Sequence, residues 1–225
     1  MRTAPDAPGY VIKAVGEPIV MRRFSPMPPA ALLIGASTGG PQALELLLTT
    51  ASSWLRLLPI AVVLHAPPGF IEVVAANIAR ASGMPTRIAC HGDKFLPGTI
   101  YFAPGDKHLR VMRADRRVIL MHSDAKPENF CKPAVDVLFS SAARAFGPEA
   151  LGIVLTGMGR DGLAGSRMLV DAGGSVIVQD EASSAVWGMP GSIARAGLAS
   201  AVLPLAGMAS ALDGLLVAKQ RRVTA

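Results

Sequence analysis

Residues 31–50 read ALLIGASTGGPQALELLLTT, an apolar run followed by a glycine-rich turn and a segment with helical spacing of its apolar residues. We expect a buried strand over 31–36 and a helix over 41–49, with proline in the first helical turn, where its missing N–H costs no hydrogen bond. The turn between them, Gly35-Ala36-Ser37-Thr38-Gly39, matches the G-x-S-x-G pattern of a serine exposed between a strand and a helix.

This turn suits a serine nucleophile for two reasons. Its glycines permit a sharp change of direction, and the free N–H groups at the start of the following helix can stabilise a negative charge. We therefore predict Ser37 as a nucleophile and the backbone N–H of Thr38 as a donor to an oxyanion. Such turns also bind phosphates, but Pro41-Gln42 stands where a P-loop needs Lys followed by Ser or Thr.

Strand and helix patterns alternate along the rest of the chain, which is typical of an α/β fold. The expected strands cover 60–64, 86–90, 99–103, 108–112, 117–122, 151–155, 175–178 and 199–203, and the expected helices cover 70–81, 133–146, 161–172, 190–196 and 206–217. We predict a doubly wound, mainly parallel sheet with helices on both faces and a small β-hairpin subregion. The hairpin is expected to join 99–103 to 108–112 around Pro104-Gly105-Asp106.

The chain is expected to divide into three parts. Residues 1–30 would form an N-terminal extension, with a small hairpin over 10–24 and a proline-rich linker over 25–29. Residues 31–218 would form the globular domain, and residues 219–225 a basic C-terminal tail.

Composition excludes several classes of protein. Of the 225 residues 51% are hydrophobic, yet no apolar run approaches the roughly 18 residues that span a bilayer. No secretory signal is visible, and the two cysteines lack disulfide-framework or zinc-ligand spacing, so a cytoplasmic location is expected. The net charge of +6 favours an acidic partner, whereas 5% aromatic residues are too few for a base-stacking nucleic-acid surface.

A serine nucleophile needs a base, and four histidines are available. His65 follows the expected strand 60–64 and so lies at the carboxyl end of the sheet, where α/β proteins form their sites. His91 and His122 are expected to face solvent, and His108 to be structural. Asp161 also follows a strand, and a carboxylate that accepts the imidazole N–H would orient the base.

A second pattern competes with this interpretation. Gly157-Met158-Gly159-Arg160-Asp161-Gly162 matches G-x-G-x-x-G after a strand, and Asp180 ends the next strand, as in dinucleotide-binding folds. Against it, the acidic residue within the turn would face the pyrophosphate. Nucleotide binding remains the alternative.

The ordinary α/β-hydrolase fold is excluded. It orders its triad Ser, Asp, His, and it needs strands before its serine, for which 36 residues are too few.

Taken in order, several segments resemble the catalytic domain of the chemotaxis protein-glutamate methylesterases, the CheB family. The matching segments, within about 32–216, are Ile34–Pro41, His65 with Pro67–Phe70, Leu96–Gly98, Ala103–His108, Lys132–Phe139, Leu155–Gly162 and Gly188–Pro190. The resemblance implies hydrolysis of glutamate γ-methyl esters on methyl-accepting chemotaxis receptors, with deamidation of some receptor glutamines. It implies Ser37, His65 and Asp161 as the triad and the N–H groups of Thr38 and Met158 as oxyanion donors.

The same resemblance implies that no cofactor or metal takes part, and that the partner is the cytoplasmic helical bundle of the receptor. Three residues depart from the family pattern around the histidine: Leu64, Ala66 and Ile71. These departures leave a second alternative beside nucleotide binding, a receptor-binding protein that has lost activity. The segment 129–132 is less polar than is usual in the family. Members commonly carry an N-terminal receiver domain, for which the 30-residue leader is too short, so we expect either a stand-alone esterase or only the catalytic portion of a longer protein.

Overall fold

The computed structural model describes residues 11–12, 19–50 and 56–223. Its centre is a seven-stranded sheet in which every neighbouring pair is parallel, in the order β11-β10-β9-β3-β4-β6-β5. The strands of this sheet are β3 (Ala31–Ala36), β4 (Ile60–Leu64), β5 (Thr86–Ile88), β6 (Ile100–Phe102), β9 (Ala150–Val154), β10 (Ser175–Gln179) and β11 (Ala201–Leu203). The prediction of a doubly wound α/β fold is confirmed.

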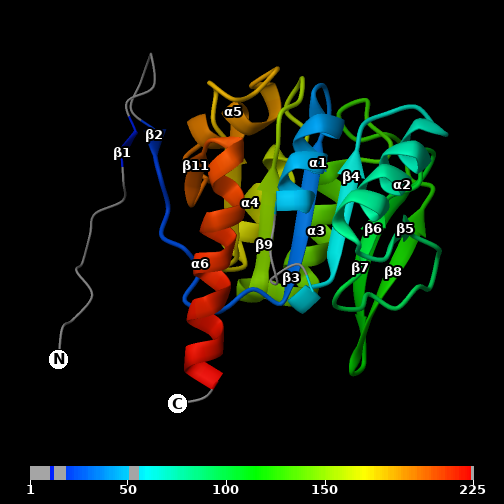
Figure 1. The fold of residues 1–225 in the computed structure, drawn as a ribbon, viewed down its shortest axis with the longest axis horizontal. Helices are drawn as coiled ribbons and strands as arrows, with labels where there is room; N and C mark the ends of the chain where they lie inside the picture. Colours follow the sequence, from blue (N-terminus) through cyan, green and yellow to red (C-terminus); the bar gives the residue numbers. More distant parts are fainter. Residues whose placement is uncertain (1–10, 13–18, 51–55, 224–225) are drawn as a thin grey trace.

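Helices cover both faces of the sheet, because the central strands are buried on both sides and read as continuous apolar runs. One layer holds α1 (Gly40–Thr50), α2 (Phe70–Ser82) and α6 (Leu205–Val223); the other holds α3 (Val135–Phe146), α4 (Leu163–Asp171) and α5 (Gly188–Arg195) (Figure 1). Alternate residues of each strand supply the two cores, as Leu32 and Leu33 do in β3. None of the described helices combines the length and apolar character needed to cross a membrane.

The expected hairpin between 99–103 and 108–112 is wrong. The first of these segments is β6, which lies in the main sheet, parallel to β4 and β5, with Ile100, Tyr101 and Phe102 all buried. The hairpin is instead β7 (His108–Ala114) with β8 (Arg117–Ser123), paired antiparallel. Its tight turn contains Asp115 at a φ of 53°, a left-handed conformation that aspartate tolerates better than most residues.

Residues 19–30, expected as part of an extension and linker, lie against the domain. The short strands β1 (Val11–Ile12) and β2 (Ile19–Val20) pair antiparallel, and the turn between them is outside the described residues. The segment that follows is anchored by hydrogen bonds from Arg22 N to Ala199 O and from Ala30 N to Glu149 O, both 2.8 Å. At the other end of the chain α6 continues to Val223, into the expected basic tail.

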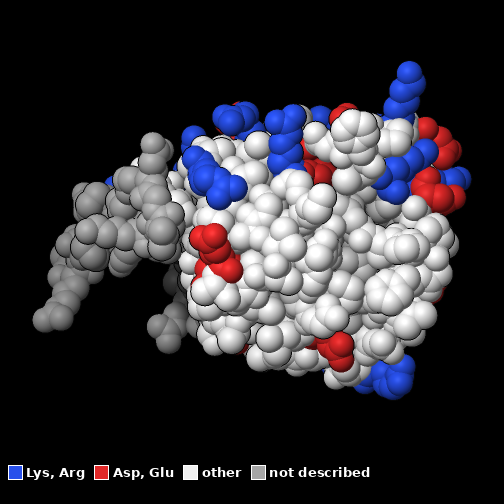
Figure 2. Space-filling model, turned by 90° about the horizontal axis from the view of Figure 1, so that it is seen from above, with Lys and Arg blue, Asp and Glu red and all other residues white. Residues whose placement is uncertain are grey.

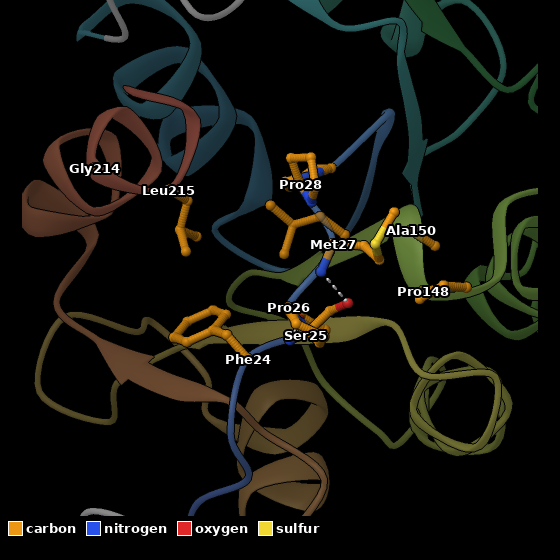
Figure 3. A pocket seen from close by; sticks show the side chains of 12 residues that line it. Phe24, Ser25, Pro26, Met27, Pro28, Pro148, Ala150, Gly214 and Leu215 are labelled. Carbon is orange, nitrogen blue, oxygen red and sulfur yellow. Dashed lines mark hydrogen bonds between the residues drawn. The ribbon is translucent and has the colours of Figure 1, made fainter. Parts of the chain in front are cut away.

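A shallow apolar pocket lies between residues 24–29 and α6 (Figure 3). Ala150, Leu151 and Ser175 also line it, and these residues stand at or next to the beginnings of β9 and β10. The pocket is therefore at the amino end of the sheet, opposite to the edge where the predicted site residues lie.

The strand order identifies one position of the sheet, between β3 and β9, where the direction of winding changes. From β3 the chain passes to β4 on one side, while β9 lies on the other side of β3. The direction of winding thus reverses between β3 and β9, and in open α/β sheets ligands bind at the carboxyl ends of the strands where this occurs. Ser37 follows β3 and residues 156–161 follow β9, so the turns singled out in the sequence border this crevice.

Candidate active site

The Ser37 turn is held in place by its neighbours in the sheet. Ser37 N donates to Thr156 O at 3.0 Å, and His65 N donates to Ala36 O at 3.0 Å, so the ladder continues one residue beyond each strand. Gly39 has a φ of 77°, and a Cβ there would lie 2.7 Å from the Cβ of Ala185. The second glycine of the pattern is therefore required both by conformation and by space.

The turn after β9 packs directly against the Ser37 turn. A Cβ added at Gly157 would lie 2.8 Å from Ser37 Cβ and would also collide with Met189 Sδ. Thr156 Oγ1 donates to Thr38 O at 2.9 Å and so ties the two turns together. The space beside Gly157 is filled by the serine turn, which disfavours the dinucleotide interpretation because that interpretation needs this space for a pyrophosphate.

Two backbone N–H groups remain available beside the crevice. Among the residues that the structure describes, neither Thr38 N nor Met158 N donates a hydrogen bond. Both residues lie outside the helices and are exposed, Met158 to 73%. Unsatisfied N–H groups on turns next to a serine are what an oxyanion site requires.

His65 and Asp161 meet, as expected from their positions after β4 and β9. His65 Nε2 lies 2.8 Å from Asp161 Oδ2, and the Asp161 side chain is only 2% exposed. The same carboxylate accepts hydrogen bonds from Val135 N at 2.7 Å, from Asp136 N at 2.9 Å and from Gly162 N at 2.9 Å. Two of these donors open α3, so Asp161 caps that helix from a distant part of the chain and its charge lies at the positive helix end.

The contact with Asp161 decides which ring nitrogen of His65 is left for chemistry. Nε2 donates to the carboxylate, so the lone pair of the ring is on Nδ1. Nδ1 lies 3.8 Å from Cys131 Sγ, and within the described residues Ser37 Oγ forms no hydrogen bond with it.

Sequence reasoning did not find the residues that surround this pair. Cys131 stands in the less polar segment 129–132, and no spacing in the sequence connects it with His65. Burial raises the pKa of the Cys131 thiol to about 11, with further contributions from Asp161 and Asp136. The thiol is thus protonated near neutral pH and is a poor rival to Ser37 as nucleophile.

Asp136 is a second buried carboxyl group next to Asp161. Its Oδ1 accepts from Gly165 N at 2.7 Å and its Oδ2 from Asn129 Nδ2 at 2.9 Å. Burial raises its pKa to about 6; the bond from Gly165 opposes this, and the charge of Asp161 adds to it. Asp136 thus anchors α4 and the 128–131 segment to the start of α3.

The other three histidines have structural partners. His108 is fully buried; its Nδ1 accepts from Ala134 N at 3.1 Å and its Nε2 lies 3.0 Å from Lys126 O. His122 Nε2 lies 2.9 Å from Ala89 O, and His122 N donates to His91 Nδ1 at 3.2 Å. His65 is therefore the histidine that lies at the crevice, after β4 and against Asp161.

The fold and the three side chains define a class: a doubly wound α/β protein with serine, histidine and aspartate at the ends of three neighbouring strands. The comparisons with known proteins give the family. The model of the CheB methylesterase family matches residues 32–212. The chain belongs to this family, and the resemblance seen in the sequence is confirmed.

Curated relatives and a solved structure support the assignment. A protein-glutamate methylesterase/protein-glutamine glutaminase of Rhodopseudomonas palustris is 49% identical over 83% of this chain and 48% of its own length. A protein of the same name from Bradyrhizobium diazoefficiens is 50% identical over 82% of this chain and 46% of its own length. The chain thus spans about half the length of these relatives. The crystal structure of the Thermotoga maritima CheB methylesterase catalytic domain matches with a TM-score of 0.80 at 33% identity, over 84% of this chain and all of that one.

Proposed function

We propose that residues 31–218 form the catalytic domain of a serine hydrolase that removes methyl groups from glutamate γ-methyl esters of chemotaxis receptors. Deamidation of receptor glutamines would use the same steps, with ammonia in place of methanol. The observation that carries the proposal is the 2.8 Å pairing of His65 with buried Asp161, beside Ser37 and two free N–H groups. The names of the curated relatives support the substrate class.

Each group has one role in the proposed reaction. Ser37 Oγ attacks the ester carbonyl and passes its proton to His65 Nδ1, because Nε2 is held by Asp161. The N–H groups of Thr38 and Met158 stabilise the tetrahedral oxyanion. His65 then protonates the departing methanol, and water attacks the acyl-enzyme and releases the glutamate.

A direct test uses the purified chain with a methylated receptor fragment that contains the cytoplasmic helical bundle. We expect methanol release, and we expect a serine-directed phosphonate to form one adduct, located by mass spectrometry on Ser37. An adduct on another residue would contradict the assignment. Receptor binding without methanol release would favour the alternative of a binding protein that has lost activity, and a nucleotide-dependent rise in the melting temperature would favour the nucleotide-binding alternative.

The surface around the crevice is suited to a protein substrate. Figure 2 looks onto the carboxyl ends of the strands, where much of the face is uncharged and Lys and Arg gather along one border. Phe130 is fully exposed and directly precedes Cys131, which contacts His65. Asn129 and Phe130 have φ values of 49° and 64° within a two-residue turn closed by hydrogen bonds between Glu128 and Cys131. A phenylalanine held in this costly conformation points to a contact outside the chain.

We propose that Phe130 packs against the receptor helix beside the methylated glutamate. In Phe130→Ala, we expect KM for the receptor fragment to rise by about tenfold, as loss of about 1.4 kcal/mol of contact predicts. kcat, and turnover of a small methyl ester, should change little. Leu96→Ala is the control, because Leu96 is also exposed but precedes β6 at the opposite edge of the sheet. Equal effects of both variants on KM would refute the role of Phe130.

A further inference from the structure

Three potential metal ligands meet at the crevice. His65, Cys131 and Asp161 each offer one ligand atom, and these atoms lie within 4.8 Å of one another. Cys131 Sγ and His65 Nδ1 are 3.8 Å apart. Asp161 Oδ2 accepts a hydrogen bond from the other ring nitrogen, Nε2. The proposed reaction uses the histidine and the aspartate but gives no task to the thiol.

The spacing of sulfur and nitrogen matches that of two ligands on one zinc ion. Bond lengths of about 2.3 Å to sulfur and about 2.05 Å to nitrogen, at a tetrahedral angle, place the two ligand atoms about 3.5 Å apart. The observed 3.8 Å needs a shift of only a few tenths of an ångström. With two protein ligands, the two remaining positions of a tetrahedral zinc ion would hold water.

The partner of Nε2 strengthens the case. Histidines that bind metals usually donate the other ring N–H to a carboxylate, which fixes the tautomer and makes the free nitrogen a better ligand. Asp161 makes this contact with Nε2 and leaves Nδ1 directed toward Cys131. The arrangement is therefore that of a carboxylate–histidine–metal site.

The local charge also favours a cation. Asp161 and Asp136 both lie close enough to interact electrostatically with the thiol. Lys132, which follows Cys131 in the sequence, has its ammonium group 3.8 Å from the carboxylate of Asp124. A His-plus-thiolate pair prefers zinc and similar ions over the hard ions Mg²⁺ and Ca²⁺.

We propose that Cys131 Sγ and His65 Nδ1 bind a zinc ion that reversibly inhibits the enzyme. Binding displaces the thiol proton to solvent and one or more waters from the ion; no electron is transferred. The ion occupies the lone pair that would accept the Ser37 proton. The binding step rests on the geometry and charge of the site, whereas the inhibition rests on the proposed function.

The binding test uses the metal-free full chain and CoCl₂ as a spectroscopic stand-in for zinc. We expect a thiolate-to-cobalt charge-transfer band that ZnCl₂ abolishes by displacement and MgCl₂ does not. In Cys131→Ser the band should be lost and zinc affinity, measured by competition with a chromophoric chelator, should fall by about tenfold or more. Cys90→Ser is the matched control, because Cys90 is the other free cysteine and is exposed. A band that persists in Cys131→Ser would overturn the site.

The inhibition test compares methanol release with and without ZnCl₂, each variant being normalised to its own metal-free rate. Wild type and Cys90→Ser should lose activity and regain it with a chelator, while Cys131→Ser should be at least about tenfold less sensitive. Equal sensitivity of Cys131→Ser and wild type would overturn inhibition through this site. Cobalt binding by a chain without esterase activity would refute the proposed function and leave the metal site standing.

Discussion

Ser37→Ala is expected to lower kcat for methanol release from a methylated receptor fragment by about 10⁴- to 10⁶-fold, the range seen when a triad nucleophile is removed. The hydroxyl supplies the bond that forms the acyl-enzyme, and a methyl group has no means to replace it. The fold should survive, because the Ser37 backbone holds the turn through Thr156 O, and Ser37 Oγ has no hydrogen bond within the described residues. Methanol release and the melting temperature, measured on one preparation, check both expectations.

Ser82→Ala is the matched control for this variant. Ser82 is another half-buried serine, at the end of α2 remote from the crevice, and its Oγ donates to Ile78 O at 2.7 Å. We expect it to keep its activity and to retain the phosphonate adduct on Ser37. Activity within a few-fold of wild type in Ser37→Ala would exclude Ser37 as the nucleophile.

Asp161→Asn is expected to lower kcat by about 10⁴-fold, as replacement of the triad aspartate does where it sets the histidine tautomer. The asparagine amide either turns an N–H toward His65 or uses its single oxygen there. In the first case Nε2 becomes an acceptor, Nδ1 carries the proton, and the base toward Ser37 is lost. kcat for methanol release, measured below the melting temperature of the variant, tests this.

The same substitution should also destabilise the fold. Four donors surround the carboxylate: His65 Nε2 and the N–H groups of Val135, Asp136 and Gly162. One amide oxygen cannot serve all four, and a buried donor left without an acceptor costs about 1–3 kcal/mol. Chemical denaturation should therefore show a lower free energy of unfolding.

Asp180→Asn is the control for Asp161→Asn, because it also removes a carboxylate at the carboxyl ends of the strands but not one that contacts His65. Asp180 follows β10, and its side chain accepts from Ser183 rather than from a histidine. We expect its kcat to stay within about threefold of wild type, since Asp180 contacts none of the triad residues. A folded Asp161→Asn enzyme with the same kcat as Asp180→Asn would contradict the orienting role of Asp161.

The hairpin shows where pattern reasoning about the fold failed. Residues 99–103 and 108–112 are both extended and are joined by a proline–glycine turn, which is a sound local signal for a hairpin. The signal is local, however, whereas the pairing partner of a strand depends on which other strands and helices are available to bury its side chains. β6 is buried on both faces and pairs with β4 and β5, whereas β7 pairs with the strand that follows it, β8.

The sequence alone determined the α/β class, the Ser37 turn and the positions of His65 and Asp161 directly after apolar strands. Each depends on short-range physics: apolar periodicity, the freedom of glycine to turn, and the rule that parallel strands end at one edge of a sheet. A histidine and an aspartate placed after apolar strands could therefore be expected near Ser37 before any contact was known.

Tertiary structure alone decided the finer chemistry of the site. The choice of Nδ1 as the free nitrogen of His65 follows from its contact with Asp161, 96 residues away in the chain. The capping of α3 by Asp161 and the approach of Cys131 to His65 likewise join segments that share no local pattern. The physical reason is that hydrogen bonds and buried charges depend on distances between side chains, which are set by packing of the whole sheet and its helices rather than by neighbours in sequence.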